Sequence, residues 1–277
     1  MKWKGRPTSK NVEDRRGAPK SAKMGGGIIL VVIVISLFTG QNPLEILQLL
    51  GGTQSNTSRP ASSPRQGSAE TGELAQFVAV VLADTEAVWG DLFGGKYPEP
   101  VLVIFEDSVR SACGLNSAAT GPFYCPGDQK LYLDLGFFRE LEKLGAPGDF
   151  ALAYVIGHEV GHHVQTVTGI SDKIRQAQRA ASGKSEANRW QVRMELQADC
   201  YAGIWAHHAQ RRFQILEAGD VEEGLRAAAA IGDDSLQQRA GRKVRPESFT
   251  HGSSADRVSW FSTGLNGGKV KDCNTLG

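Results

Sequence analysis

The residues best suited to chemistry in this sequence are His158 and His162, with Glu159 between them. In a helix, residues four apart project from the same face, so both imidazoles can bind one metal ion through neutral ring nitrogens. Glu159 lies at the edge of that face, where its carboxylate can take a proton from a water molecule that the metal activates. The spacing therefore predicts a zinc-dependent hydrolytic site.

A catalytic zinc ion takes three protein ligands and keeps one position open for water. Glu195 is the best third ligand in the sequence, and Asp199 follows four residues later on the same helical face. Asp199 is placed to accept a hydrogen bond from the free ring nitrogen of a ligand histidine. The alternative is a pair of solvated charges, which their apolar neighbours disfavour because an unpaired buried carboxylate is costly. Those neighbours are Ala198, Cys200, Tyr201, Ala202, Ile204 and Trp205.

Further segments carry recognisable motifs: residues 121–126, 158–165, 195–203 and 248–254, with a basic N-terminal stretch and the apolar run that follows it. Together they resemble the neutral zinc metallopeptidase family of bacterial membrane proteins, which is similar to the zinc proteases with a glutamate ligand. The resemblance implies His158, His162 and Glu195 as zinc ligands. It also implies a zincin-like domain, Glu159 as general base, and a peptide or protein as substrate.

Such a site usually adds a second electrophile that stabilises the negative charge on the carbonyl oxygen. His251 is our candidate, because it lies in a predicted loop at residues 248–254, and Arg257 nearby could orient it or add positive charge. The alternative is that His251 only caps the next helix, in which case Tyr201 is the next candidate donor. His163 points about a quarter turn away from the ligand face, so we expect it to form hydrogen bonds rather than bind the metal.

Two other functions compete with peptide hydrolysis. In the first, zinc only stabilises a non-catalytic binding module. Glu159 argues against this, because a structural site has four protein ligands and needs no glutamate between its histidines. In the second, the same residues hydrolyse an amide that is not a peptide, an alternative that the sequence leaves open, as it does the oligomeric state.

The elements that must position these residues indicate an α+β fold that is mostly helical and has a small sheet. The folded domain is expected to span residues 73–277. Its first helix begins near Glu73 and ends at a glycine pair, and strands are expected at 101–105 and 130–134. Later helices are expected at residues 136–144, 151–168, 186–218 and 221–230.

The four cysteines, Cys113, Cys125, Cys200 and Cys273, are even in number and form no CxxC pair, which favours disulfides over a metal site. Of the three connectivities, we prefer Cys113–Cys125 around a Gly-Pro turn and Cys200–Cys273, which would tie the C-terminal tail to a helix. The alternative, four reduced thiols, would require a cytosolic location.

The N-terminal part of the chain has a composition of its own. Residues 1–23 carry eight basic and two acidic residues, and an apolar segment at 24–44 follows, long enough for one membrane crossing. Residues 45–72 predict a flexible linker. Because basic residues stay in the cytoplasm, the leader is expected inside and the domain outside a cell membrane that the chain crosses once. The alternative is a cleaved secretory signal. The net charge of +1 argues against a nucleic-acid partner.

Overall fold

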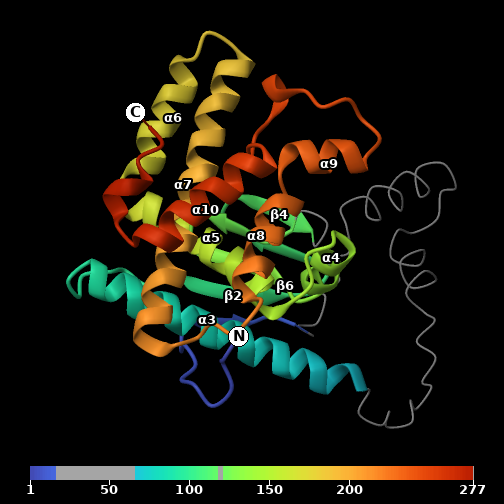
Figure 1. The fold of residues 1–277 in the computed structure, drawn as a ribbon, viewed down its shortest axis with the longest axis vertical. Coiled ribbons are helices and arrows are strands. Elements are labelled where there is room, and N and C mark those ends of the chain that lie inside the picture. Colours follow the sequence, from blue (N-terminus) through green and yellow to red (C-terminus); the bar gives the residue numbers. More distant parts are fainter. Residues whose placement is uncertain (17–65, 118–120, 277) are drawn as a thin grey trace, which may run out of the picture. The chain divides into compact units, whose positions relative to one another are not determined.

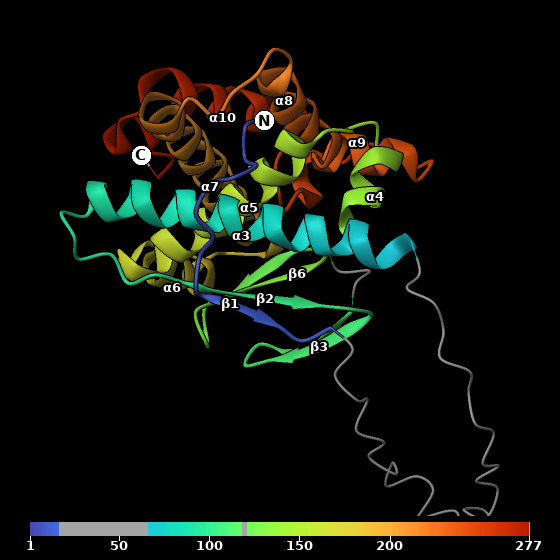
Figure 2. The ribbon, with the colours of Figure 1, turned by 90° about the horizontal axis from the view of Figure 1, so that it is seen from below.

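Helix α5 (Asp149–Val167), which carries the two histidines of the motif, runs through the middle of the fold. Its side chains are apolar around most of the circumference and nearly all are buried. Figure 2 shows the reason: the sheet lies on one side of α5 and a layer of helices on the other. The structure is a computed structural model that describes residues 1–16, 66–117 and 121–276.

The sheet has four strands in the order β1-β2-β6-β5. Strands β1, β2 and β6 run parallel, whereas β5 pairs antiparallel with β6 and forms one edge. The two central strands are almost entirely buried, because helices and loops cover both faces. A separate hairpin, β3-β4, precedes β5. The bounds are β1 (Val12–Asp14), β2 (Val101–Phe105), β3 (Ser108–Ser111), β4 (Gly114–Ser117), β5 (Phe123–Cys125) and β6 (Lys130–Asp134).

Helices make up most of the described chain, which confirms the mostly helical α+β fold (Figure 1). Strands β2 and β6 coincide with the predicted ones, whereas α6, α9 and α10 were not predicted. The helices are α3 (Gln66–Leu92), α4 (Phe137–Lys143), α6 (Ile170–Ala180), α7 (Lys184–Phe213), α8 (Asp220–Ala230), α9 (Asp233–Arg239) and α10 (Ser254–Gly267), with short 3-10 turns η2 (Pro246–Ser248) and η3 (Val270–Cys273).

Glycines allow the central helices to approach closely. A Cβ on Gly161 of α5 would lie 2.9 Å from the carbonyl oxygen of Ala198 on α7, closer than side chains come in proteins. A Cβ on Gly264 of α10 would lie 1.9 Å from the carbonyl oxygen of Cys200. Helix α7 is therefore held directly against α5 on one side and α10 on the other, so side chains from all three meet in one place.

Residues 1–16 are an integral part of this domain. Strand β1 pairs with β2 through Val12 opposite Leu102, and the Trp3 ring packs against Phe77 with ring centroids 5.5 Å apart. The sequence analysis had assigned residues 1–23 to a leader outside the domain, whereas the structure places residues 1–16 in the same compact unit as Glu70–Gly277. The short strand escaped notice because it has no apolar alternation.

The predicted anchor at residues 24–44 and most of the predicted linker lie outside the described residues. Only the end of that linker is described, and it belongs to α3, which begins at Gln66. Within the part of the chain that the structure describes, no helix is both long and apolar enough to pass through a membrane. The two disulfides join Cys113 to Cys125 and Cys200 to Cys273, the pairing preferred from the sequence.

Candidate metal centre

Three side chains converge on one point between α5 and α7. The Nε2 atom of His158 lies 3.2 Å from Oε2 of Glu195, and the Nε2 atom of His162 lies 3.5 Å from the same oxygen. One ligand atom from each residue falls within 4.8 Å of the other two. Two imidazoles and one carboxylate are a donor set that suits catalytic zinc. The residues present therefore fit the predicted metal.

A network centred on a buried carboxylate holds His158. Oδ1 of Asp199 accepts hydrogen bonds from Nδ1 of His158 at 2.7 Å and from the Tyr154 hydroxyl at 2.5 Å. Arg257 donates to both carboxylate oxygens of Asp199 at 2.9 Å. Asp199 is fully buried and the Arg257 side chain is 2% exposed. Because Nδ1 is occupied in this way, Nε2 of His158 is left for a metal.

The charges of this network offset the cost of burial. Burial alone would raise the pKa of Asp199, but the Arg257 guanidinium and His158 hold that pKa below its ordinary value. Burial would lower the pKa of His158, yet without a cation the neighbouring Asp199 carboxylate raises it to about 10. A metal must displace that proton, so its affinity should fall as the pH falls.

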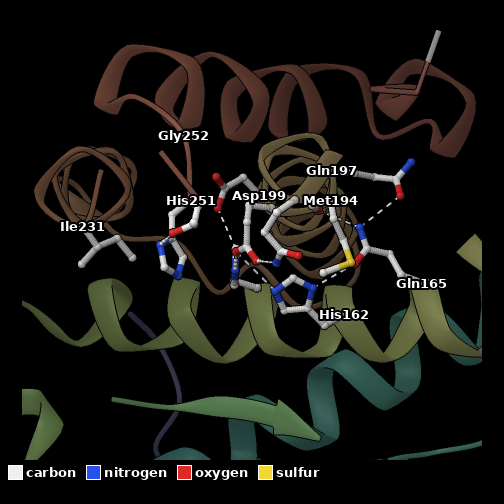
Figure 3. A network of polar contacts seen from close by, with 12 residues as sticks. His162, Gln165, Met194, Gln197, Asp199, Ile231, His251 and Gly252 are labelled. Atoms are coloured by element: carbon white, nitrogen blue, oxygen red, sulfur yellow. Dashed lines mark hydrogen bonds and ion pairs between the residues drawn. The ribbon is translucent and has the colours of Figure 1, made fainter. Parts of the chain in front are cut away.

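A different network, made of neutral amides, holds His162. Nδ1 of His162 donates to Oε1 of Gln165 at 2.9 Å. The Gln165 amide nitrogen donates to the Met194 carbonyl at 2.7 Å and to Oε1 of Gln197 at 3.1 Å. The Gln197 amide nitrogen in turn donates to the Cys273 carbonyl at 2.9 Å. Figure 3 shows these side chains in a row that leads away from the site.

The third candidate ligand, Glu195, is ionised and oriented. Its second oxygen, Oε1 of Glu195, accepts a hydrogen bond from Gln191 at 2.8 Å, and Gln178 bonds to Gln191 at 3.0 Å. Burial would raise the pKa of Glu195, but the two histidines hold it well below the ordinary value. The Oε2 atom therefore carries negative charge toward both Nε2 atoms.

The metal-ligand group opens into a cleft of about 1150 Å³. Glu159 lines this cleft together with His158, His162 and Glu195. The edge strand β5 contributes Phe123 and Tyr124 to its wall. The predicted general base thus faces the same space as the predicted ligands.

His251 also lines the cleft, but its partner differs from the one expected. Its Nδ1 atom lies 3.5 Å from Oδ1 of Asp233, and Oδ2 of Asp233 accepts the backbone N–H groups of Thr250, His251 and Gly252 at 2.6–2.9 Å. Asp233 raises the pKa of His251 above its ordinary value. Arg257, which we expected either to orient His251 or to add positive charge, pairs with Asp199 and also lines the cleft.

Other sequence candidates lie elsewhere. The Tyr201 ring packs in the core against Trp89 with centroids 5.5 Å apart, and it does not line the cleft. His163 is fully buried and bonds to the Pro98 carbonyl at 2.6 Å and the Tyr124 hydroxyl at 3.1 Å, a hydrogen-bonding role as predicted. Burial lowers the pKa of His163.

Several residues that hold the site were missed. Tyr154 looked like one more apolar residue of a buried helix, and Asp233 lies just after the helix predicted at 221–230, where no element was expected. Gln165 and Gln197 lie within the quoted motifs, but glutamine has no characteristic ligand spacing. A signal was present at Gln165, which lies three residues after His162 and therefore on a neighbouring helical position.

A second group of possible ligands lies among the described residues, formed by Asp149, Asp220 and Glu223. It contains no imidazole. The amino group of Met1 lies 2.6 Å from Asp149 and 3.4 Å from Asp220, which already supplies positive charge there. The group on α5 and α7 is therefore the better candidate for a zinc site.

Comparison with known proteins agrees with this geometry. The model of a family described as "Putative neutral zinc metallopeptidase" matches residues 1–276, which confirms the resemblance found in the sequence. The chain belongs to this family. The match spans the N-terminal segment as well as the metal centre, so the family as a whole includes both parts.

Curated relatives carry no assigned activity. The chain is 46% identical over 291 aligned residues to the uncharacterized protein YpfJ of Escherichia coli (strain K12), with 100% of this chain and 99% of YpfJ covered. It is 40% identical over 202 residues to the uncharacterized protein Rv2575 of Mycobacterium tuberculosis (strain H37Rv), with 69% and 67% covered. No solved structure matches the chain significantly.

Proposed function

We propose that this protein hydrolyses peptide bonds with a zinc ion held by His158, His162 and Glu195. The observation that carries the proposal is the convergence of two Nε2 atoms on one carboxylate oxygen, at 3.2 and 3.5 Å, at the wall of a large cleft. Zinc bound there would make a water molecule acidic enough to ionise near neutral pH and would polarise the substrate carbonyl. The protein's own residues supply the rest of the chemistry.

Glu159 is the proton carrier in this proposal. It follows His158 directly in the sequence and lines the cleft, and the proposed zinc site has its three ligands without it. Its carboxylate takes the proton from the attacking water and returns it to the nitrogen of the leaving amine. The Glu159 carboxylate can therefore carry out both proton transfers from its position on α5.

His251 stabilises the negative charge that develops on the carbonyl oxygen. Its side chain lines the cleft and is 52% exposed, and Asp233 favours the protonated imidazolium. A charged donor held at that position would stabilise the transition state more than the neutral substrate. The catalytic role proposed for His251 thus rests on its place in the cleft and on its pairing with Asp233.

The edge strand favours peptides over other amides. Among the described residues, strand β5 has a partner strand on one side only, and its residues line the cleft beside the proposed metal ligands. An extended peptide can pair with such an edge through backbone hydrogen bonds. The cleft of about 1150 Å³ is also larger than most small-molecule sites. A purely structural zinc site is disfavoured, because it would be closed by a fourth protein ligand.

The two disulfides support a location outside the cytoplasm for the domain, because cytosolic thiols are kept reduced. We therefore propose that the protein acts on exported or cell-surface peptides and proteins. Membrane attachment through residues 24–44 stays a prediction, whereas a crossing that separates residues 1–16 from the domain conflicts with the pairing of β1 and β2.

The deciding experiment is Glu159→Gln. We expect this variant to hold one zinc per chain, measured by elemental analysis, and to lose peptide cleavage in a mixed peptide library by at least about 100-fold. The exposed Glu222→Gln makes the same chemical change on α8 and should keep both properties. Full cleavage by Glu159→Gln would rule out the mechanism, and a wild-type protein without zinc would rule out the metal centre.

A further inference from the structure

We propose that Gln165 and Gln197 form an amide relay that positions His162, and that the Cys200–Cys273 disulfide holds the far end of the relay. The inference rests on the proposed zinc site and goes beyond it. It assigns a role to two buried glutamines that neither bind the metal nor line the cleft. Gln165 is fully buried and Gln197 is 4% exposed.

The direction of each hydrogen bond follows from two backbone carbonyls, that of Cys273 at the end of the relay and that of Met194 beside Gln165. A backbone carbonyl can only accept, so Gln197 must turn its NH₂ group toward Cys273. Its oxygen then faces Gln165, which must turn its own NH₂ toward Gln197 and the Met194 carbonyl. The Gln165 oxygen is left for His162, which must donate from Nδ1. The unprotonated nitrogen of His162 is therefore Nε2, the atom that faces Glu195.

The disulfide holds the last acceptor of the relay in place. Cys273 ends η3, at the C-terminal end of the described chain, and it is fully buried. Its partner Cys200 lies on α7, three residues after Gln197. The covalent bond thus keeps the Cys273 carbonyl 2.9 Å from the Gln197 amide. Without the bond the tail is held only by hydrogen bonds such as that from Thr275 to the Arg193 carbonyl, and Gln197 can lose the acceptor that fixes its orientation, whereas Gln165 keeps the Met194 carbonyl.

The second disulfide provides a matched comparison. Cys113–Cys125 joins the β3-β4 hairpin region to β5, and none of the hydrogen bonds described above for the His158 and His162 networks ends on either cysteine. Both bonds stabilise the fold, but only one is connected to a ligand. A general loss of stability and a specific loss of ligand positioning can therefore be separated.

The test is a double-mutant cycle with zinc affinity as the readout, measured by competition with a chelator. We expect Gln197→Leu and the pair Cys200→Ala with Cys273→Ala each to weaken zinc binding by about 10-fold or more, the range for partners of ligand histidines. The variant that combines both changes should bind zinc no less tightly than the single variant with the lower zinc affinity, because both changes break the same relay. Cys113→Ala with Cys125→Ala should keep zinc affinity within about two-fold.

Several outcomes decide the proposal. Unchanged zinc affinity in Gln197→Leu, or independent losses that multiply in the combined variant, would overturn the relay. Should the variant without Cys200–Cys273 fail to fold, Gln197→Leu keeps the disulfide and still must lose affinity. The absorption spectrum of its Co²⁺ form should change as well, which a purely structural role would not require. Zinc binding without peptide cleavage would instead count against the proposed function alone.

A second, independent inference concerns the N-terminal segment. Residues 1–16 share a sheet with the domain, and Arg6 donates to both oxygens of Asp84 at 2.7 and 2.6 Å. We infer that residues 1–16 and the metal centre lie on the same side of any membrane, because paired strands cannot be separated by a bilayer. A single crossing between them, with the N-terminus in the cytoplasm and the domain outside, is incompatible with this fold.

Surface labelling tests this inference in intact spheroplasts that express the chain. All four native cysteines are in disulfides, so Lys10→Cys and Lys184→Cys each introduce one exposed thiol, the first in the N-terminal segment and the second on α7. We expect a membrane-impermeant maleimide to label both positions to the same extent before and after permeabilisation. Labelling of one position in intact cells and of the other only after permeabilisation would overturn the inference.

Discussion

The two histidines proposed as ligands, His158 and His162, are held by different kinds of network. His158 is hydrogen-bonded to a buried ion pair, in which Arg257 donates to both oxygens of Asp199 at 2.9 Å. His162 is held by a row of two neutral amides, the second of which donates a hydrogen bond to a backbone carbonyl. The ionic network is strong but leaves a costly buried charge if either partner is lost. The amide network buries no charge, and its orientation depends on the two backbone carbonyls, of Met194 and Cys273, that accept hydrogen bonds from it.

Both networks end on residues that follow α7 in the chain. Arg257 belongs to α10 and Cys273 to η3, and both elements pack on α7. The C-terminal part of the domain therefore completes the surroundings of both histidines. It contributes no ligand itself but supplies the last partner of each network.

The largest effect should come from breaking the ionic network. Arg257→Ala leaves the Asp199 carboxylate buried without its partner, and we expect the free energy of unfolding to fall by about 3–5 kcal/mol in chemical denaturation. The exposed Arg226→Ala on α8 removes the same side chain from the surface and should cost less than about 0.5 kcal/mol. A loss below about 1 kcal/mol at Arg257 would show that the ion pair is not what holds this region.

A change of charge at constant shape sharpens the comparison. Asp199→Asn keeps the size of the side chain but removes the charge that favours Nδ1–H on His158. We expect zinc affinity to fall toward the 100-fold end of the range for such partners. Chelator competition at fixed pH measures the loss. An affinity equal to that of the wild type would mean that hydrogen bonding alone, without charge, orients His158.

A substitution in the amide network should lower zinc affinity less than one in the ionic network. Gln165→Met keeps the volume and removes the acceptor for His162, and we expect zinc affinity to fall by roughly 10-fold without a large loss of stability. Gln210→Met alters a glutamine on the same helix α7 that carries Gln197, and it should leave zinc affinity unchanged. A larger loss of zinc affinity in Gln165→Met than in Asp199→Asn would show that the amide network contributes more to zinc binding than the ionic network.

The smallest effect concerns His251, which belongs to neither network. Asp233 raises the pKa of His251, so the charged form persists to higher pH than usual. Stability from this pairing is present below the ordinary histidine pKa and is lost as the pH rises through the raised value. In Asp233→Asn the pKa should fall, and the alkaline limb of kcat/KM should move to lower pH by less than about one unit. Asp234→Asn, whose carboxylate instead accepts from Ser254, should leave that limb in place.

Much of the metal centre was predictable, because it depends on local geometry. Four-residue spacing places His158 and His162 on one face of any helix, and the same holds for Glu195 and Asp199. Strands 101–105 and 130–134 were predicted with their observed bounds, since compact apolar runs between turn residues form buried strands. Each of these features involves residues close together in the chain.

The features that could not be predicted join residues far apart. The partner of Arg257 depends on how α10 crosses α7, an approach that Gly264 allows and no periodicity reveals. Strand β1 exists only because β2 offers it an edge, so its residues carry no strand pattern of their own. The sequence by itself determined which residues can bind zinc and on which helices they lie. Only the tertiary structure decided what holds each ligand, because a hydrogen-bond partner is selected by proximity in space and the sequence encodes proximity only within an element.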